Sequence, residues 1–149
     1  MERPFKYPTF NIRIKNENGK AFVFDQVRKK WLVLSPEEWV RQHLINYLNS
    51  EKKVPLSLIS IEKEIELNNT RKRYDVVVYN KEAKPVLLIE CKAPDVELTK
   101  ATVEQTLRYN LILDVKYLMI SNGIGDVSIV IEENKPRVLS ELPDFENLV

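Results

Sequence analysis

The stretch PVLLIECK, residues 85–92, is apolar until it ends in two charged side chains. A short continuous run of Val, Leu and Ile is typical of a strand that is buried on both faces. Alternate side chains of a strand point to opposite faces, so Glu90 and Lys92 share one face and Cys91 points to the other. The stretch therefore predicts a central strand with a polar site at its end.

The preceding stretch, residues 73–79, predicts a second strand. The polar turn 80–84 would join it to strand 85–92 as a hairpin. Asp75 lies at the edge of its β-branched run, where hairpin pairing would bring it beside Glu90. Two carboxylates suit Mg²⁺, with Mn²⁺ as its substitute, and a nearby Lys92 can orient a bound water. The alternative is an ordinary ion pair between Lys92 and either carboxylate, which contributes little to stability if exposed.

Working outward, the remaining periodic segments predict a mixed β-sheet core with helices packed on it, of class α/β or α+β. The expected elements are an N-terminal β-hairpin (10–15 and 20–25), strands 31–34, 56–67, 116–121 and 126–132, and helices 36–49 and 99–113. Strand 56–67 is half polar and should flank the sheet. We expect one domain over residues 1–149, with a β extension (1–34), a core (35–125) and a C-terminal strand and tail (126–149).

Composition narrows the class of protein. The chain has 149 residues, of which 44% are hydrophobic and 30% charged, and this balance excludes a disordered or fibrous protein. The net charge of +1 means that any nucleic-acid site must be a local patch. Cys91 is the one cysteine, which favours the reducing cytoplasm. No apolar run approaches the roughly 20 residues of a membrane span, so no membrane partner is expected.

The first predicted helix begins with a strong start signal. Ser35 caps the helix, Pro36 takes its first position, and Glu38, three residues after the cap, completes a capping box. Glu37 lies on the helix stripe that carries Val40 and should face the core.

Two motifs resemble those of a known family. Asp75, followed by Glu90-Cys91-Lys92, resembles the D…(D/E)xK signature of PD-(D/E)xK nucleases, and QTLRY at 105–109 resembles the QxxxY motif of their RecB-like branch. More narrowly, the stretch from Ser35 to Asn122-Gly123 is similar to the N-terminal nuclease domain of type I restriction enzyme R (HsdR) subunits, in a standalone form. The resemblance spans residues 27–125, and Tyr74 replaces the proline of the family name.

The resemblance implies a restriction-endonuclease-like fold and a Mg²⁺-dependent endonuclease that hydrolyses DNA. By it, Asp75, Glu90 and the Cys91 carbonyl would bind the metal, and Lys92 would position the attacking water. The family's helix-one acid maps onto Glu37 in preference to Glu38, which has its capping role.

The same resemblance gives a catalytic role to the second helix. Gln105 and Tyr109 are four residues apart, so they are neighbours on one helix face. There they could hydrogen-bond a catalytic group, the DNA backbone or one another, although simple packing of an amphipathic tyrosine is the alternative. The 149 residues contain no GxxxxGK[ST] motif, so DNA translocation would need a partner protein of a restriction-modification system.

Basic clusters are the candidate DNA contacts. Arg71, Lys72 and Arg73 immediately precede the Asp75 strand and could bind phosphates, and residues 28–30 are a weaker candidate. The sequence shows no interleaving of aromatic and basic residues that would predict a platform for stacked bases. The competing hypothesis is an inactive DNA-binding or protein-interaction module on a nuclease-like fold. One active site cuts one strand, so double-strand cleavage would call for a homodimer or two successive cuts.

Overall fold

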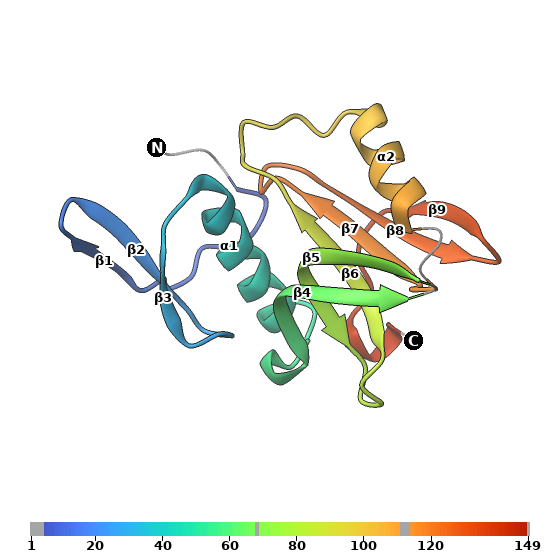
Figure 1. Ribbon diagram of the computed structural model, residues 1–149, viewed down its shortest axis with the longest axis horizontal. Coiled ribbons are helices and arrows are strands. Elements are labelled where there is room, and N and C mark those ends of the chain that lie inside the picture. The colour runs from blue at the N-terminus through green and yellow to red at the C-terminus, as the bar shows by residue number, and fades with distance from the viewer. Residues whose placement is uncertain (1–4, 68, 111–113, 149) are drawn as a thin grey trace.

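The computed structural model describes residues 5–67, 69–110 and 114–148. Its main element is a six-stranded sheet in which neighbouring strands follow the order β4-β5-β6-β7-β8-β9 (Figure 1). Strands β6 and β7 pair in parallel and the other neighbours are antiparallel. The strands are β4 (Ile59–Leu67), β5 (Thr70–Tyr79), β6 (Pro85–Cys91), β7 (Tyr117–Ser121), β8 (Asp126–Glu132) and β9 (Lys135–Leu139).

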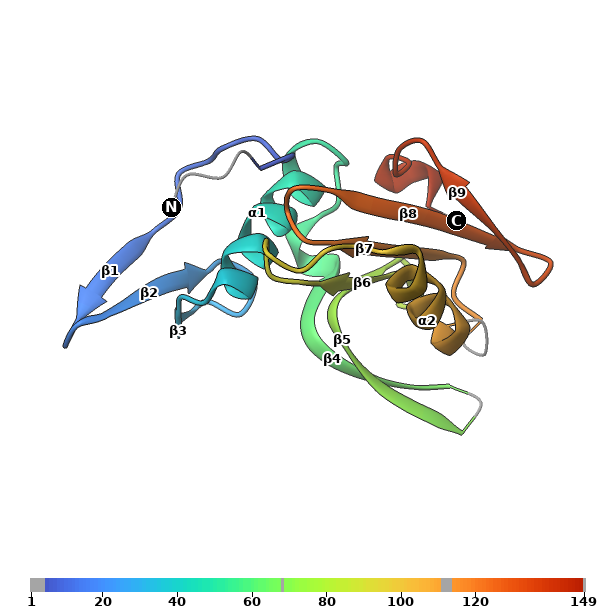
Figure 2. The ribbon, with the colours of Figure 1, turned by 90° about the horizontal axis from the view of Figure 1, so that it is seen from above.

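A second sheet of three antiparallel strands precedes the first helix. It consists of β1 (Ile14–Glu17), β2 (Lys20–Asp25) and β3 (Lys30–Val33) in sequence order. Figures 1 and 2 show that this N-terminal sheet lies apart from the six-stranded sheet, with the first helix between them. The predicted hairpin is therefore present, and β3 extends it to a sheet.

Two helices pack on opposite faces of the large sheet. Helix α1 (Pro36–Ser50) begins where the Ser35 hydroxyl accepts the Glu38 amide, and α2 (Lys100–Asn110) leads into β7. Two short 3₁₀ helices, η1 (Leu56–Leu58) and η2 (Phe145–Asn147), precede β4 and close the described chain. Neither α1 nor α2 is long and apolar enough to cross a membrane.

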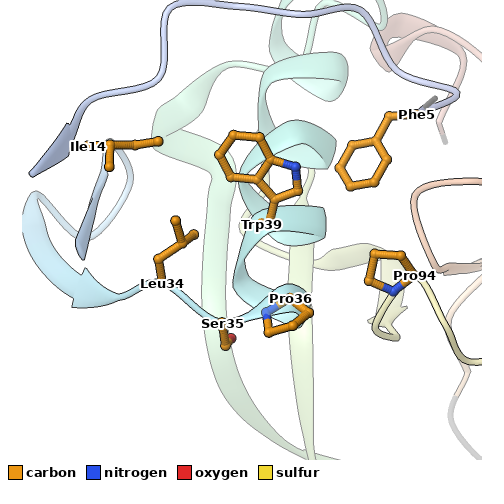
Figure 3. A pocket seen from close by; sticks show the side chains of 7 residues that line it. All are labelled: Phe5, Ile14, Leu34, Ser35, Pro36, Trp39 and Pro94. Atoms are coloured by element: carbon orange, nitrogen blue, oxygen red, sulfur yellow. The ribbon is translucent and has the colours of Figure 1, made fainter. Parts of the chain in front are cut away.

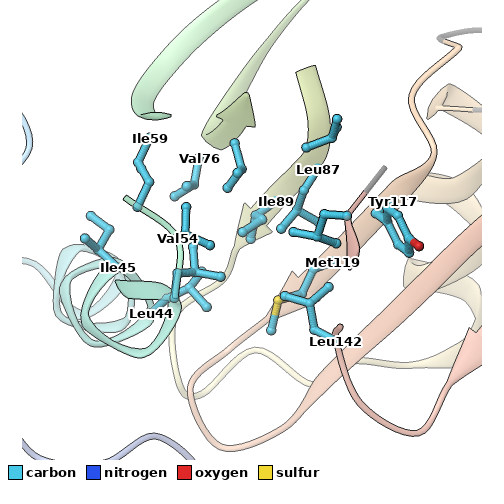
Figure 4. Close-up of a cluster of buried hydrophobic side chains, with 14 of the residues drawn as sticks. Leu44, Ile45, Val54, Ile59, Val76, Leu87, Ile89, Tyr117, Met119 and Leu142 are labelled. Atoms are coloured by element: carbon cyan, nitrogen blue, oxygen red, sulfur yellow. The ribbon is translucent and has the colours of Figure 1, made fainter. Parts of the chain in front are cut away.

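The apolar residues of β6 alternate between two cores. Leu87, Ile89 and Cys91 pack with α1, and Leu88 packs in a smaller cluster with partly buried residues of α2. Figure 4 shows the larger core, in which side chains of α1 meet those of β4 to β7. Strand 85–92 is thus buried on both faces, as its composition predicts.

Several predicted boundaries were wrong. Strand β1 begins at Ile14 and not at Phe10, whose ring instead packs edge-on against His43 of α1. Residues 56–58 form η1, and β5 begins three residues early because Thr70 pairs with Leu67 of β4. Strand β9 had no predicted counterpart. The predicted end of the second helix near Leu113 lies outside the described residues.

Candidate nuclease site

The alternation of β5 breaks at Asp75. Tyr74 packs with Val77 in the cluster beneath α2, whereas Val76 packs in the core beneath α1. An unbroken strand would place Tyr74 and Val76 on the same face. On β4 the residue opposite Asp75 is Glu62, which has a left-handed φ of 52°. This local distortion frees the Asp75 side chain from the regular direction of a strand residue.

The Asp75 carboxylate continues the hydrogen-bond ladder between β5 and β6. The backbone ladder reaches Val76 opposite Ile89, and Asp75 Oδ2 then accepts the Cys91 amide at 2.7 Å. The amide and carbonyl of a strand residue point to the same side, so the Cys91 carbonyl also faces β5. Two of the three predicted metal ligands are therefore neighbours, in an arrangement that the strand register imposes.

Glu90 and Lys92 lie beside this pair. Glu90 Oε2 is 4.0 Å from Lys92 Nζ, and the side chain of Lys92 is 37% exposed, so a substrate can reach it. Both groups act on Asp75: burial raises the pKa of Asp75, Glu90 raises it further, and Lys92 lowers it. The sequence-predicted Asp75, Glu90 and Lys92 thus lie within electrostatic range of one another.

The predicted phosphate-binding residues divide into two groups. Lys72 forms an ion pair with Glu90 across β5 and β6, and its ammonium also lies 5.0 Å from the centre of the Tyr74 ring. Arg71 and Arg73 are exposed, and Arg71 pairs with Glu64 and Glu66 of β4. Exposure therefore separates Arg71 and Arg73, which we expect to reach a ligand, from half-buried Lys72, although Arg71 and Lys72 are both paired with glutamates.

The two acids at the start of α1 have different surroundings. The side chain of Glu37 is 47% exposed and lies 3.4 Å from Arg41, which is itself 3.5 Å from Asp75. Partial burial raises the pKa of Glu37, and Asp75 raises it further, while Arg41 and Lys92 lower it. Glu37 therefore borders the site, but the prediction that it faces the core was wrong: its side chain is 47% exposed, and the first turn of α1 instead buries Glu38 against Arg41.

Glu38 has a different role from the one predicted. Its amide donates to the Ser35 hydroxyl, which is one half of a capping box. The carboxylate is nearly buried and accepts hydrogen bonds from Arg28, Arg41 and Gln42 in place of the cap amide. Two arginines attract the carboxylate more strongly than one backbone amide, which explains the departure from the capping box.

Sequence reasoning missed Arg41. Its side chain is 5% exposed and forms ion pairs with Glu37, Glu38, Glu62 and Asp75. Its buried Nε has no hydrogen-bond partner among the described residues. Spacing could have revealed part of this cluster, because Arg41 lies four residues after Glu37 and three after Glu38 on one helix.

Helix α2 bonds to strand β5 through a residue that was not predicted, Asn110. Gln105 is exposed, and in residues 5–67, 69–110 and 114–148 no hydrogen bond joins it to the predicted catalytic groups. The Tyr109 side chain lies outside the described part of the chain. Buried Asn110 instead accepts the Tyr74 hydroxyl and donates to the Thr106 carbonyl, which anchors α2 beside the strand that carries Asp75.

An apolar pocket adjoins the site. It has a volume of about 360 Å³ and lies between the N-terminal arm, the start of α1 and the segment after β6 (Figure 3). Pro36, in its wall, precedes Glu37, and Pro94 follows Lys92 by two residues. Its lining consists of Phe5, Ile14, Leu34, Ser35, Pro36, Trp39 and Pro94.

The donor set fits a magnesium ion. Carboxylates and carbonyls are its preferred protein ligands, and it keeps several waters rather than demanding a full protein cage. Within the described residues no three His, Cys, Asp or Glu side chains come together as a metal cluster. Two carboxylates and one carbonyl, with water in the remaining positions, are therefore the set that the site can offer.

Comparisons with known proteins bear on the fold and the family of the chain. A fragment of a candidate HsdR subunit of a type I restriction enzyme from Vibrio vulnificus superposes with a TM-score of 0.55 at 18% identity, over 77% of this chain and 24% of that one. The chain thus spans about a quarter of that fragment. A candidate nuclease of DUF820 from Anabaena variabilis has a TM-score of 0.49 at 13% identity, over 88% of this chain and 86% of that one. No curated protein matches.

The first superposition shows the fold of the chain. The family model described as type I restriction enzyme R protein N terminus (HSDR_N) matches residues 36–145, which include α1, Asp75, Glu90, Lys92 and α2. The chain therefore belongs to the HSDR_N family of type I restriction enzyme R protein N-terminal domains.

Proposed function

We propose that the protein is a Mg²⁺-dependent endonuclease that hydrolyses DNA phosphodiester bonds. The observation that carries the proposal is the 2.7 Å bond from the Cys91 amide to Asp75, which holds two candidate ligands together beside Glu90 and Lys92. Membership of the HSDR_N family supports the same reaction. Mn²⁺ should substitute for Mg²⁺, because it accepts the same oxygen ligands.

Each residue has a role in this reaction. Asp75, Glu90 and the Cys91 carbonyl would hold the metal, which when bound supplies positive charge to the phosphate oxygens. The Lys92 ammonium donates hydrogen bonds to the attacking water and to the phosphate oxygen that gains charge. The water oxygen bonds to phosphorus and its proton passes to solvent, while the bond from phosphorus to the leaving oxygen breaks and solvent protonates that oxygen. Glu37 borders this site through Arg41.

One observation favours a second candidate, an inactive DNA-binding or protein-interaction module. Each carboxylate already has a cationic neighbour, since Arg41 approaches Asp75 and Lys72 pairs with Glu90. These cations neutralise the charge that a metal would otherwise meet. Such a module would bind DNA in the presence of a chelator.

Calorimetry of Mg²⁺ and Mn²⁺ binding separates the two candidates. We expect the parent to bind either ion and Asp75→Asn to lose most of that binding, because an amide replaces a charged ligand. Asp95→Asn, an exposed aspartate on the segment after β6, is the matched control and should bind like the parent. Absence of binding in the parent, repeated with DNA present, would favour the inactive module.

Cleavage assays test Lys92. Lys92→Ala should reduce the rate of DNA cleavage at least about 100-fold while metal binding persists, because the water loses its positioned donor. Lys84→Ala, in the exposed turn between β5 and β6, should cut at the parental rate. If Lys92→Ala cuts as fast as the parent at equal metal concentration, Lys92 has no part in the reaction.

The remaining assignments belong to the same proposal. DNA is the proposed partner, with Arg71 and Arg73 as exposed phosphate contacts and a homodimer as the species that cuts both strands. A translocase of a restriction-modification system would supply movement along DNA. The family and the buried, unpaired Cys91 support a cytoplasmic location.

A further inference from the structure

One face of the N-terminal sheet carries a row of aromatic rings. Phe22 and Phe24 alternate along β2, and Trp31 pairs with Phe24 from β3, with 5.4 Å between the two ring centres. All three side chains are half-buried. Val23 and Asp25, on the opposite face of β2, are fully buried. The aromatic face is therefore the outer face of this sheet.

Cations from β1 and the residue before it lie on these rings. The Arg13 guanidinium is 4.4 Å from the centre of the Phe24 ring, and the Lys15 ammonium is 4.6 Å from that of Trp31. Along the chain these residues are separated, so the sequence shows no interleaving of basic and aromatic residues. The pairing of β1 with β2 and of β2 with β3 creates it.

The charge of this sheet differs from that of the chain. Residues 13–33 contain six Lys or Arg and two acidic residues, a net charge of +4, whereas the whole chain has +1. Of the two acids, Asp25 is buried and bonded to Arg28, and Glu17 forms an exposed ion pair with Lys15, with 3.3 Å between the charged atoms, so five of the six cations are opposed by Glu17 alone. The exposed charge of this element is therefore strongly positive and complements a polyanion.

We propose that the face formed by Arg13, Lys15, Phe22, Phe24 and Trp31 binds single-stranded nucleic acid. Flat aromatic side chains on a sheet stack unpaired bases, while neighbouring cations bind the phosphates between them. On binding, Arg13 and Lys15 leave the rings and pair with phosphates. A duplex keeps its bases stacked inside and can use only the cations, so it binds this face more weakly.

This inference rests on the proposed function for its biological use. It deepens that function by naming single-stranded DNA as the form of DNA that the domain binds. The N-terminal sheet is linked to the nuclease core by Arg28, which bonds to Asp25, to Glu38 of α1 and to Glu62 of β4. A strand bound on the aromatic face is thus held on an element tied to both sides of the candidate site.

Fluorescence anisotropy in a chelator tests the inference without cleavage. The probes are a labelled 12-nucleotide oligothymidine and a labelled 12-base-pair duplex. We expect the parent to prefer the single strand, and Trp31→Leu to weaken that binding at least about fivefold, because one stacking surface is removed. Phe145→Leu, in η2, is the matched control and should bind like the parent. Equal binding of single strand and duplex by the parent, or no binding, would overturn the inference.

The cations are tested by salt dependence. Arg13→Gln combined with Lys15→Gln should reduce the slope of log affinity against log salt by about 1.4, which is about 0.7 for each phosphate that the variant no longer neutralises. Lys81→Gln combined with Lys84→Gln, in the exposed turn after β5, should leave the slope unchanged. An unchanged slope in the first pair would mean that these cations do not meet phosphate.

The fluorescence of Trp31 reports stacking directly, so this test does not depend on a substitution at Trp31 that could disturb folding. The chain has two tryptophans, so Trp39→Phe leaves Trp31 as the single tryptophan, which can be excited selectively over the tyrosines. Oligothymidine should quench its fluorescence by stacking and the duplex should not; an unquenched Trp31 at saturating oligonucleotide would contradict the stacking. Both binding assays run in a chelator and measure no cleavage, so failure of the proposed nuclease activity would leave their result unaffected.

Discussion

Arg41 shows how one buried side chain holds the candidate site together. It pairs with acids from both ends of the site, Glu37 on its own helix and Asp75 on β5. Burial lowers the pKa of Arg41, but the neighbouring acidic groups, led by Glu38 and Asp75, together raise it above its usual value, so the group stays charged. Its positive charge in turn opposes the rise that burial causes in the pKa of Asp75. Arg41 thereby favours the ionised carboxylate that a metal requires.

Removal of Arg41 should destabilise the fold. Arg41→Met leaves several carboxylates without their buried partner, and we expect the free energy of unfolding to fall by about 3–5 kcal/mol in chemical denaturation. Arg137→Met removes an exposed partner of Glu132 and should change it by less than about 0.5 kcal/mol. An equal decrease in the free energy of unfolding of the two variants would show that the buried ion pairs of Arg41 stabilise the fold no more than an exposed pair does.

Helix α1 carries two acids, Glu37 and Glu38, next to the candidate site, and its first turn sets their position. Ser35 caps it from the extended region, with φ −105° and ψ 164°, and Pro36 occupies the first turn without losing a hydrogen bond. Glu37 and Glu38 follow at once, where the positive end of the helix dipole favours carboxylates. The cap and the acids are therefore one local arrangement.

The cap can be tested with a matched pair of serines at the two ends of α1. Ser35→Ala should lower the free energy of unfolding by about 1 kcal/mol, because the Glu38 amide loses its acceptor. Ser50 is exposed and its hydroxyl donates to the Asn46 carbonyl of its own helix. Ser50→Ala should therefore change thermal unfolding little; a larger effect there than at Ser35 would refute the cap assignment.

At the scale of the whole molecule, Arg28 joins three elements. It follows β2, and its guanidinium lies 2.8 Å from Asp25, 3.2 Å from Glu38 and 3.3 Å from Glu62. The N-terminal sheet forms no ladder with the six-stranded sheet among the described residues. Side-chain contacts of this kind therefore determine how firmly the N-terminal sheet is attached.

Hydrogen exchange can measure this attachment. Arg28→Gln should increase exchange of the β2 amides roughly tenfold, since the charge-assisted bonds that hold the sheet are removed. Amides of β6 and β7, in the central core, should keep their protection. A matching loss of protection in β6 and β7 would mean that the two sheets unfold as one unit and that Arg28 contributes to global stability.

Local patterns determined most elements. The apolar run 85–92 and the β-branched run 76–78 encode strands because a short stretch reveals its own burial. The turn 80–84 then makes hairpin pairing of these strands the simplest arrangement, which brings Asp75 near Glu90. Strand β9 was missed because its sequence KPRVL includes a proline and its side chains are largely exposed, as an edge strand permits.

By itself, the sequence therefore determined the class of fold, the central hairpin and the residues Asp75, Glu90 and Lys92 at its end. Only the tertiary structure decided the partners of these groups: Arg41 for Asp75, Lys72 for Glu90, and the cations on the aromatic face of the N-terminal sheet. The physical reason is the sequence distance over which each kind of information acts. Periodicity records the burial of each residue within its own element, whereas contacts between distant elements depend on how all the surfaces pack at once.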